Sequence, residues 1–166
     1  MLLTANIGSA SKKYALFREG AELLRAHFER ENKNYIVSWN REGAVAREVI
    51  TEEKYNEAAR LVIEQMHQHG ALSSIGIRVV APGAFFARHQ RITDDFITKL
   101  ETAQEFAPLH VSATLAEIKE LKQLFPNTPL FAASDSAFHG TLPKVATTYA
   151  LPKEYTAQFE LQRFGY

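Results

Sequence analysis

The hydrophobic pattern of the chain changes its period at Thr51, and this change restricts the possible folds more than any other feature. Before Thr51, apolar and polar residues alternate in short segments separated by turn-forming residues, which is typical of antiparallel strands. After Thr51, segments with helical spacing alternate with short, almost wholly apolar runs that suit buried strands. Antiparallel strands followed by alternating helices and buried strands predict an α/β fold, with one mixed sheet and helices on its faces.

Turn residues and cap residues set the expected limits of these elements. Five strands are expected before Thr51, at residues 2–7, 14–18, 23–28, 35–39 and 44–50, and two buried strands follow at 74–80 and 129–133. Thr51, Thr93 and Ser112 are expected to cap three helices, of which the first ends at Gly70 and the third at Pro126. Residues 106–110 are then an apolar connector, and residues 153–159 form a short helix.

Composition excludes several classes of protein. A chain of 166 residues is long enough to be one domain with its own core. The 19 Lys and Arg residues equal the 19 Asp and Glu residues, so no net charge attracts nucleic acid or an anionic membrane. The absence of cysteine excludes disulfides and thiolate chemistry. The apolar run at Met1 to Ala5 is too short for a signal peptide or a membrane span, so we expect a soluble, cytoplasmic protein.

The turn between the first two strands, Asn6 to Lys13, has a composition that suits phosphate. Gly8 lets the backbone approach a ligand closely, Ser9 and Ser11 offer hydroxyls, and Lys13 offers a compact positive charge. The spacing of a P-loop is absent, and no helical pattern follows the turn. Taken alone, this segment is better explained as an ordinary hairpin turn, since Gly, Ser and Asn favour turns for conformational reasons.

Two charged residues lie at the ends of the predicted buried strands. Arg78 is the one charge in its strand, and Asp135 follows the next buried strand directly. Ligands gather at strand ends in open sheets, and a cation with a carboxylate there would suit phosphoryl transfer. Each residue also has a purely structural explanation, because Arg78 could pair with a nearby acid and Asp135 could be a helix N-cap. His110 and His139 could belong to a site or be ordinary hydrogen-bonded residues.

Six segments of the chain occur together, and in the same order, in acetate kinases. They are the turn at 6–13, the strand at 76–80, Ala107-Pro108-Leu109-His110, Asp135-Ser136-Ala137-Phe138-His139 with Thr141 and Pro143, Tyr149-Ala150-Leu151-Pro152, and Arg163-Phe164-Gly165-Tyr166. The chain therefore resembles the acetate, propionate and butyrate kinase family from end to end. The resemblance implies a ribonuclease-H-like, actin-like ATPase fold, and reversible transfer of the ATP γ-phosphoryl group to a short carboxylate with Mg²⁺.

The resemblance also implies roles for individual residues. Asn6, Ser9, Ser11 and Lys13 match the phosphate loop of the family. Arg78 matches the arginine that contacts the carboxylate and the transferred phosphoryl group. Asp135 matches the catalytic aspartate associated with magnesium, so Asn6 and Asp135 are the expected metal ligands. The substrate pocket matches Val80, Leu109, His110 and Tyr166, with Tyr166 in place of the usual phenylalanine.

The chain departs from the family pattern at several positions near these residues. Ala81-Pro82-Gly83 stands where the family has His-Gly-Gly, and Ile77 replaces a histidine before Arg78. Val111-Ser112 replaces Asn-Pro after His110, and Ala10 replaces a serine in the loop. These departures bear on the substrate range and on the activity.

The family pattern continues beyond the position of Tyr166 into a His-Gly-Thr-Ser-His motif and a second lobe that holds the adenosine site. We therefore expect residues 1–166 to be a single domain, the N-terminal lobe of an acetate-kinase-like protein. Such a lobe is expected to be inactive or nearly inactive alone, because phosphoryl transfer needs both walls of a closing cleft. We expect a monomer or a weak dimer.

Two other classes of function stay open. The chain could be a non-catalytic binding or scaffold domain derived from such a kinase, which the changes at residues 81–83 favour and the retained Arg78 and Asp135 disfavour. A two-metal nuclease of similar sheet topology ranks third, because the first strand offers Asn6 and no carboxylate to hold a metal.

Overall fold

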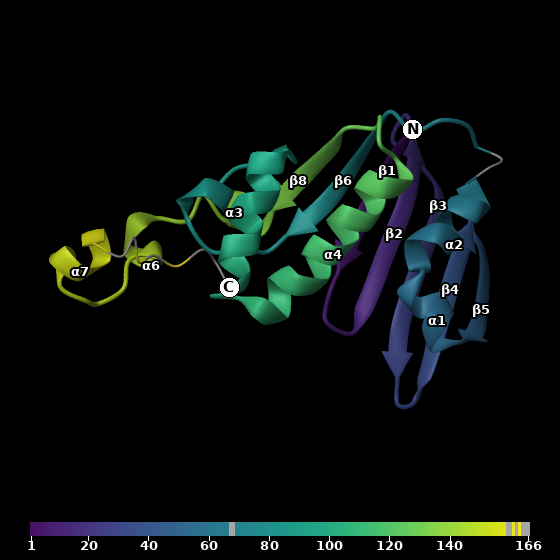
Figure 1. The fold of residues 1–166 in the computed structure, drawn as a ribbon, viewed down its shortest axis with the longest axis horizontal. Helices are drawn as coiled ribbons and strands as arrows, with labels where there is room; N and C mark the ends of the chain where they lie inside the picture. The colour runs from purple at the N-terminus through teal and green to yellow at the C-terminus, as the bar shows by residue number, and fades with distance from the viewer. Residues whose placement is uncertain (67–68, 159–160, 162, 164–166) are drawn as a thin grey trace.

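The structure, a computed structural model, describes residues 1–66, 69–158, 161 and 163, and it is built around one eight-stranded sheet (Figure 1). The order of the strands in the sheet is β5-β4-β3-β2-β1-β6-β8-β7. The strands are β1 (Leu2–Ile7), β2 (Ser11–Arg18), β3 (Ala21–Glu31), β4 (Asn34–Arg41), β5 (Ala44–Ile50), β6 (Ser74–Val79), β7 (Gln90–Arg91) and β8 (Leu130–Ser134).

Strand pairing is antiparallel in the first part of the chain and parallel at the centre of the sheet. Strands β1 to β5 pair antiparallel in sequence order, while β6 pairs parallel to both β1 and β8. The turns after β2 and β4 are tight, and Gly20 and Gly43 adopt φ angles of 86° and 94° there, which glycine reaches without strain. This mixed architecture confirms the predicted fold class.

The helices begin after β5 and alternate with the last three strands along the chain. They are α1 (Glu52–Asn56), α2 (Ala58–Met66), the 3₁₀ turn η1 (Ala84–Phe86), α3 (Asp94–Gln104), α4 (Pro108–Leu124), α5 (Asp135–Phe138), α6 (Lys144–Thr147) and α7 (Lys153–Gln158). Helices α1 to α4 lie over the same face of the sheet (Figure 1). None of the helices in the described part of the chain is long and apolar enough to cross a membrane.

Two of the three predicted helix caps are correct. The Thr51 hydroxyl accepts the backbone N–H of Lys54 at 3.3 Å, and the Thr93 hydroxyl accepts that of Phe96 at 3.2 Å. The helix after Thr51 is divided at Glu57 into α1 and α2. The two parts pack on different neighbours. Tyr55 of α1 contacts the Tyr35 ring, whereas Val62 of α2 is buried in the core.

The predicted start of α4 at Ser112 is wrong, and so is the connector predicted at residues 106–110. Helix α4 begins at Pro108, with Ala107 as its N-cap residue. Proline suits the first helical position because its fixed φ angle is helical and its missing N–H has no partner there. Ser112 lies one turn inside the helix, where its hydroxyl donates to the carbonyl of Pro108 at 2.6 Å. The predicted helix at 153–159 is found as α7 up to Gln158, and Phe159 lies outside the described residues.

The core lies between the sheet and the helical layer. Alternate residues of β1 and β6, among them Ala5 and Ile77, are buried against α4, whose Ile118 and Leu121 are fully buried. Across β2, β3 and β4, the rings of Tyr14, Phe28 and Trp39 pack edge to face, with centroids 5.9 and 5.6 Å apart. The buried residues pack the sheet against the helices, and the ring contacts pack β2, β3 and β4 against one another. The ends of the central strands therefore lie next to a well-packed core.

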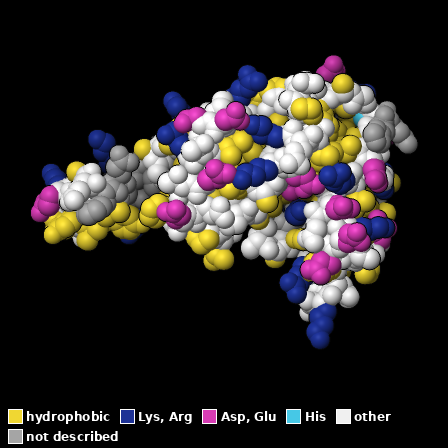
Figure 2. Space-filling view, viewed as in Figure 1, with side chains coloured by type: hydrophobic (Ala, Val, Ile, Leu, Met, Phe, Trp, Pro, Cys, Tyr) yellow, Lys and Arg dark blue, Asp and Glu magenta, His cyan; other side chains and the backbone are white. Residues whose placement is uncertain are grey.

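The segment that contains α6 and α7 extends away from the sheet (Figure 1). Its apolar side chains are exposed, with Val145 at 85% and Tyr155 at 52%, and Phe138 of α5 is 76% exposed. Figure 2 shows hydrophobic side chains gathered along one side of this extension. The segment is therefore not part of the core that supports the strand ends.

Candidate active site

Strands β1, β6 and β8 bring three polar residues to the same edge of the sheet. The register aligns Ala5 with Ile77 across β1 and β6, and Arg78 with Ala133 across β6 and β8. Because the three strands are parallel to one another, they end at the same edge, where ligands bind in open sheets. Asn6, Arg78 and Asp135 therefore meet, although they lie far apart in the sequence.

Arg78 and Asp135 form a bidentate ion pair at this edge. Arg78 Nε donates to Asp135 Oδ1 at 2.8 Å, and Nη2 donates to Oδ2. Arg78 Nη1 also lies 3.4 Å from Asn6 Oδ1. The hydrogen bonds to Asp135 raise the pKa of the Arg78 guanidinium, which is therefore a permanent cation. The side chain of Arg78 remains 48% exposed, so the cation is accessible to a ligand.

Asp135 is the first residue of α5, and the N-cap is Ser134. The structural explanation of Asp135 as the N-cap is therefore wrong by one residue. Ser134 is held from two sides, because its N–H donates to His89 Nδ1 at 3.1 Å and its hydroxyl donates to the carbonyl of Phe86. The sequence gives no signal for the contact of His89 with Ser134, because this contact depends on β7 pairing with β8.

A cavity of about 310 Å³ opens beside the ion pair. Gly8 and Ser9 of the turn between β1 and β2 form one wall, and Leu109 and Thr114 of α4 form another. We call residues 8–10 the β1–β2 loop; the Gly8 N–H donates to the Ser11 carbonyl at 2.8 Å and closes it. The complete lining is Asn6, Ile7, Gly8, Ser9, Arg78, Val80, Leu109, Thr114 and Asp135.

The cavity brings together six of the predicted site residues, namely Asn6, Ser9, Arg78, Val80, Leu109 and Asp135. Ser11 and Lys13 do not line it. Lys13 lines a neighbouring hollow of about 580 Å³ on the sheet, which Asn6 and Arg78 also line. His110 lies in the first turn of α4, and its side chain is outside the described part of the structure, as is the whole of Tyr166.

Thr114 also lines the cavity, although it is not among the site residues predicted from the sequence. It is 3% exposed and lies in α4, whose N-cap is Ala107, five residues before the predicted cap Ser112. Pro108 is the signal that could have placed the helix correctly, since proline is favoured at the first helical position.

Asn6 and Asp135 offer oxygen ligands of the kind that Mg²⁺ prefers. Both carboxylate oxygens of Asp135 accept hydrogen bonds from Arg78, and the described residues contain no group of three or more His, Asp or Glu side chains arranged to hold a metal. Mg²⁺ commonly binds through one or two protein oxygens together with water and substrate phosphates. The residues present fit that pattern, provided that a ligand draws Arg78 from Asp135.

The fold and this arrangement of residues define the class of the protein as an actin-like ATPase domain of the kind found in acetate and propionate kinases. The crystal structure of a propionate kinase from Francisella tularensis covers 99% of this chain, with a TM-score of 0.82 and 29% sequence identity. The Porphyromonas gingivalis acetate kinase has the same fold, with a TM-score of 0.81 and 24% identity over 99% of this chain.

Sequence comparison identifies the family. The profile described as the Acetokinase family matches residues 1–166, and this chain belongs to that family. A curated acetate kinase from Geobacillus sp. (strain WCH70) is 32% identical over 176 residues, which include 99% of this chain. The resemblance seen in the sequence is thereby confirmed. The chain spans 44% of the length of that acetate kinase and 44% of the Francisella structure.

Proposed function

We propose that residues 1–166 are the N-terminal lobe of an acetate-kinase-like phosphotransferase, which moves the γ-phosphoryl group of ATP to acetate or another short carboxylate. The observation that carries this proposal is the accessible Arg78 guanidinium, held by Asp135 and Asn6 beside a cavity. A planar guanidinium binds carboxylates and phosphates through two parallel hydrogen bonds. The names of the relatives, acetate and propionate kinases, support a short carboxylate as the substrate.

Binding of substrate would rearrange the ion pair. Asp135 now occupies two donors of Arg78, and a substrate carboxylate or phosphoryl group would compete with Asp135 for them. The freed Asp135 carboxylate and the Asn6 amide oxygen would then hold Mg²⁺, which would neutralise charge on the phosphate oxygens. Arg78 would then pair with the substrate anion and Asp135 with Mg²⁺, so neither charged side chain would be left without a partner.

The remaining residues of the site would orient the substrate. Val80 and Leu109 give the cavity apolar surface for the short alkyl group of the carboxylate, while Ser9 offers a hydroxyl to phosphate oxygens. Lys13 makes no ion pair within the described part of the chain and shares a hollow with Arg78, so its ammonium group can attract phosphate. In this proposal, the adenosine site and the second wall of the cleft would come from a second lobe, because this chain spans only 44% of the length of the Geobacillus acetate kinase.

Titration with acetyl phosphate tests this proposal directly. We expect the NMR signals of Gly8, Ser9 and Arg78 to shift on binding, and the Arg78→Ala variant to lose the effect. Arg47→Ala is the matched control, because Arg47 is also about half exposed, at 54%, and pairs with Glu31 at 2.7 Å. The proposal fails if acetyl phosphate shifts no signal of the cavity, or if the Arg78→Ala variant binds it as well as the unaltered chain does.

A second candidate is a non-catalytic binding domain, and the exposed apolar side chains of Phe138 and Val145 favour it. Such a domain need not form acetyl phosphate when it is joined to a second lobe, so an activity measurement separates the two candidates.

A further inference from the structure

A carboxylate is buried in the interior beneath the candidate site. Glu117 of α4 is 2% exposed, and its Oε1 accepts the hydroxyl of Tyr14 at 2.7 Å. Its Oε2 lies 3.7 Å from Lys12 Nζ, which also donates to the Asn56 carbonyl of α1 at 3.1 Å. The cluster of Lys12, Tyr14 and Glu117 therefore joins β2 to α4 and to α1.

The elements that this cluster joins also supply both walls of the cavity. Lys12 and Tyr14 follow the β1–β2 loop on β2, and Glu117 lies about one turn beyond Thr114 on α4. A change in the distance between Glu117 and Lys12 would therefore also change the distance between the β1–β2 loop and α4.

We propose that Glu117 is a positioning residue of the candidate site, which acts through Lys12 and Tyr14 to hold the β1–β2 loop at a fixed distance from α4. The inference rests on the proposed function in one respect, that this loop receives the phosphoryl group. A loop whose amides and hydroxyls stand in place before the ligand arrives binds it without first losing conformational freedom.

Stability alone does not account for a carboxylate at this position. Burial raises the pKa of Glu117, and the nearby Glu120 raises it further, while Lys12 and Tyr14 lower it without restoring the ordinary value. Burial therefore disfavours the ionised form of this side chain. A carboxylate that is buried at this cost and that joins β2 to α4 fits a positioning role.

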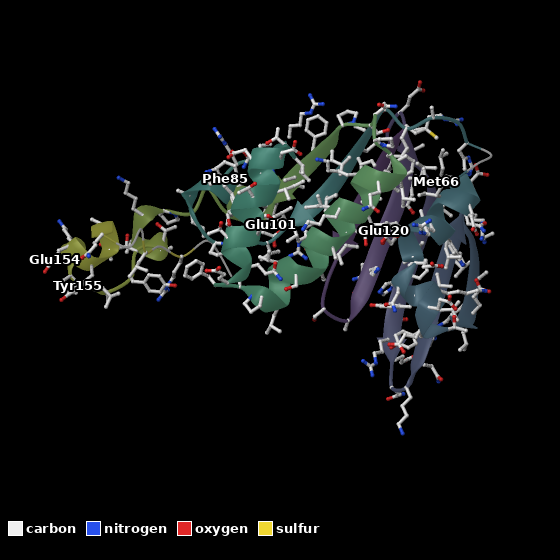
Figure 3. All side chains as sticks on the ribbon, viewed as in Figure 1. Met66, Phe85, Glu101, Glu120, Glu154 and Tyr155 are labelled. Carbon is white, nitrogen blue, oxygen red and sulfur yellow. The ribbon has the colours of Figure 1, made fainter. Side chains whose placement is uncertain are left out.

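The variant that isolates the charge is Glu117→Gln, which keeps an oxygen to accept the Tyr14 hydroxyl and removes the charge opposite Lys12. The matched control is Glu120→Gln on the same helix (Figure 3). Glu120 Oε1 lies 3.7 Å from Arg60 Nε, the same separation, but its partner is on α2 and not on the loop strand. Hydrogen exchange of the Gly8 to Ala10 amides measures the order of the loop, and thermal unfolding measures overall stability.

We expect the loop amides of Glu117→Gln to exchange about tenfold faster at pH 7, because the ion pair between Lys12 and the buried carboxylate is lost, while Tm stays the same or rises. Glu120→Gln should leave loop exchange unchanged. Unchanged loop exchange in Glu117→Gln overturns the proposal. A fall in Tm large enough to explain the faster exchange also overturns the proposal, because Glu117 would then contribute only to overall stability.

Lys12→Met removes the ion pair between Lys12 and Glu117 by changing the lysine. It therefore tests the proposal even if Glu117→Gln does not fold. It should loosen the loop similarly, and the double variant should add little further loosening. Acetyl phosphate titration of the unaltered chain separates the two proposals. If no binding is seen, the proposed function fails, whereas the exchange result still decides whether Glu117 positions the loop.

Discussion

At the scale of single residues, the ion pair of Arg78 with Asp135 sets the state of the site. Asp135 competes with an incoming anion for the same guanidinium donors, and its own negative charge lines the cavity. We predict that Asp135→Asn binds acetyl phosphate in the absence of metal about tenfold more tightly than the unaltered chain, because a charged competitor is removed. Calorimetric titration measures this change, and weaker binding by the variant would contradict the competition.

Gly8 gives a second prediction at this scale. A Cβ atom at Gly8 would meet the Ser11 carbonyl oxygen at 3.6 Å and the Ser11 Oγ at 3.8 Å, which are ordinary contacts. Gly8→Ala should therefore leave the free energy of unfolding within about 1 kcal/mol of the original value. It should weaken acetyl phosphate binding, because the methyl group would lie where the ligand approaches the backbone. A loss of stability, or unchanged binding, would show that Gly8 has only a conformational role.

At the scale of secondary structure elements, the packing of β2 on α4 makes stability depend on pH. The raised pKa of Glu117 means that the folded chain retains a proton that the unfolded chain releases near its ordinary pKa of 4.5. The free energy of unfolding therefore falls as the pH rises from about 4.5 through the raised pKa. Glu117→Gln lacks this term, so its stability relative to the unaltered chain should increase across this range.

Denaturant unfolding of both proteins at several pH values measures that difference. The lowered pKa values of Glu22 and Asp94 act in the opposite direction, but they are common to both proteins and cancel in the comparison. A difference that is constant with pH, or that shrinks as the pH rises, would contradict the assignment of the raised pKa to Glu117.

The elements also show how far the sequence determines the structure. The alternation before Thr51 and the caps Thr51 and Thr93 predict strands and helices correctly, because these signals are local. The start of α4 differs from the prediction, because Ser112 is a residue type typical of an N-cap whereas the helix begins at Pro108. The two-residue strand β7 has no local pattern at all and exists only by pairing with β8.

The candidate site was predictable only in part for the same reason. The positions of Arg78 and Asp135 at strand ends, together with the resemblance to acetate kinases, predict both as site residues, and both line the cavity. The contact between Tyr14 and Glu117 joins residues 103 positions apart, so no pattern in the sequence reveals it. The sequence likewise predicts only that Arg78 could pair with a nearby acid, and the structure identifies that acid as Asp135.

At the scale of the whole molecule, the chain covers 44% of the length of the Geobacillus acetate kinase. The cavity lies at the strand ends, and the extension with α6 and α7 carries exposed apolar side chains. In the proposed function, a second lobe closes over this edge and supplies the nucleotide site. The isolated chain should therefore form no acetyl phosphate from ATP, acetate and Mg²⁺.

Formation of acetyl phosphate by a joined protein tests the central claim most directly. The protein would combine this chain with the part of the Geobacillus acetate kinase that it does not cover, with Arg78→Ala as the test variant and Arg47→Ala as the control. We predict activity in the joined protein and in the control, and a loss of at least about 100-fold in Arg78→Ala. Two results would contradict the proposed function. The joined protein could fold and bind ATP but form no acetyl phosphate, or Arg78→Ala could leave its activity unchanged.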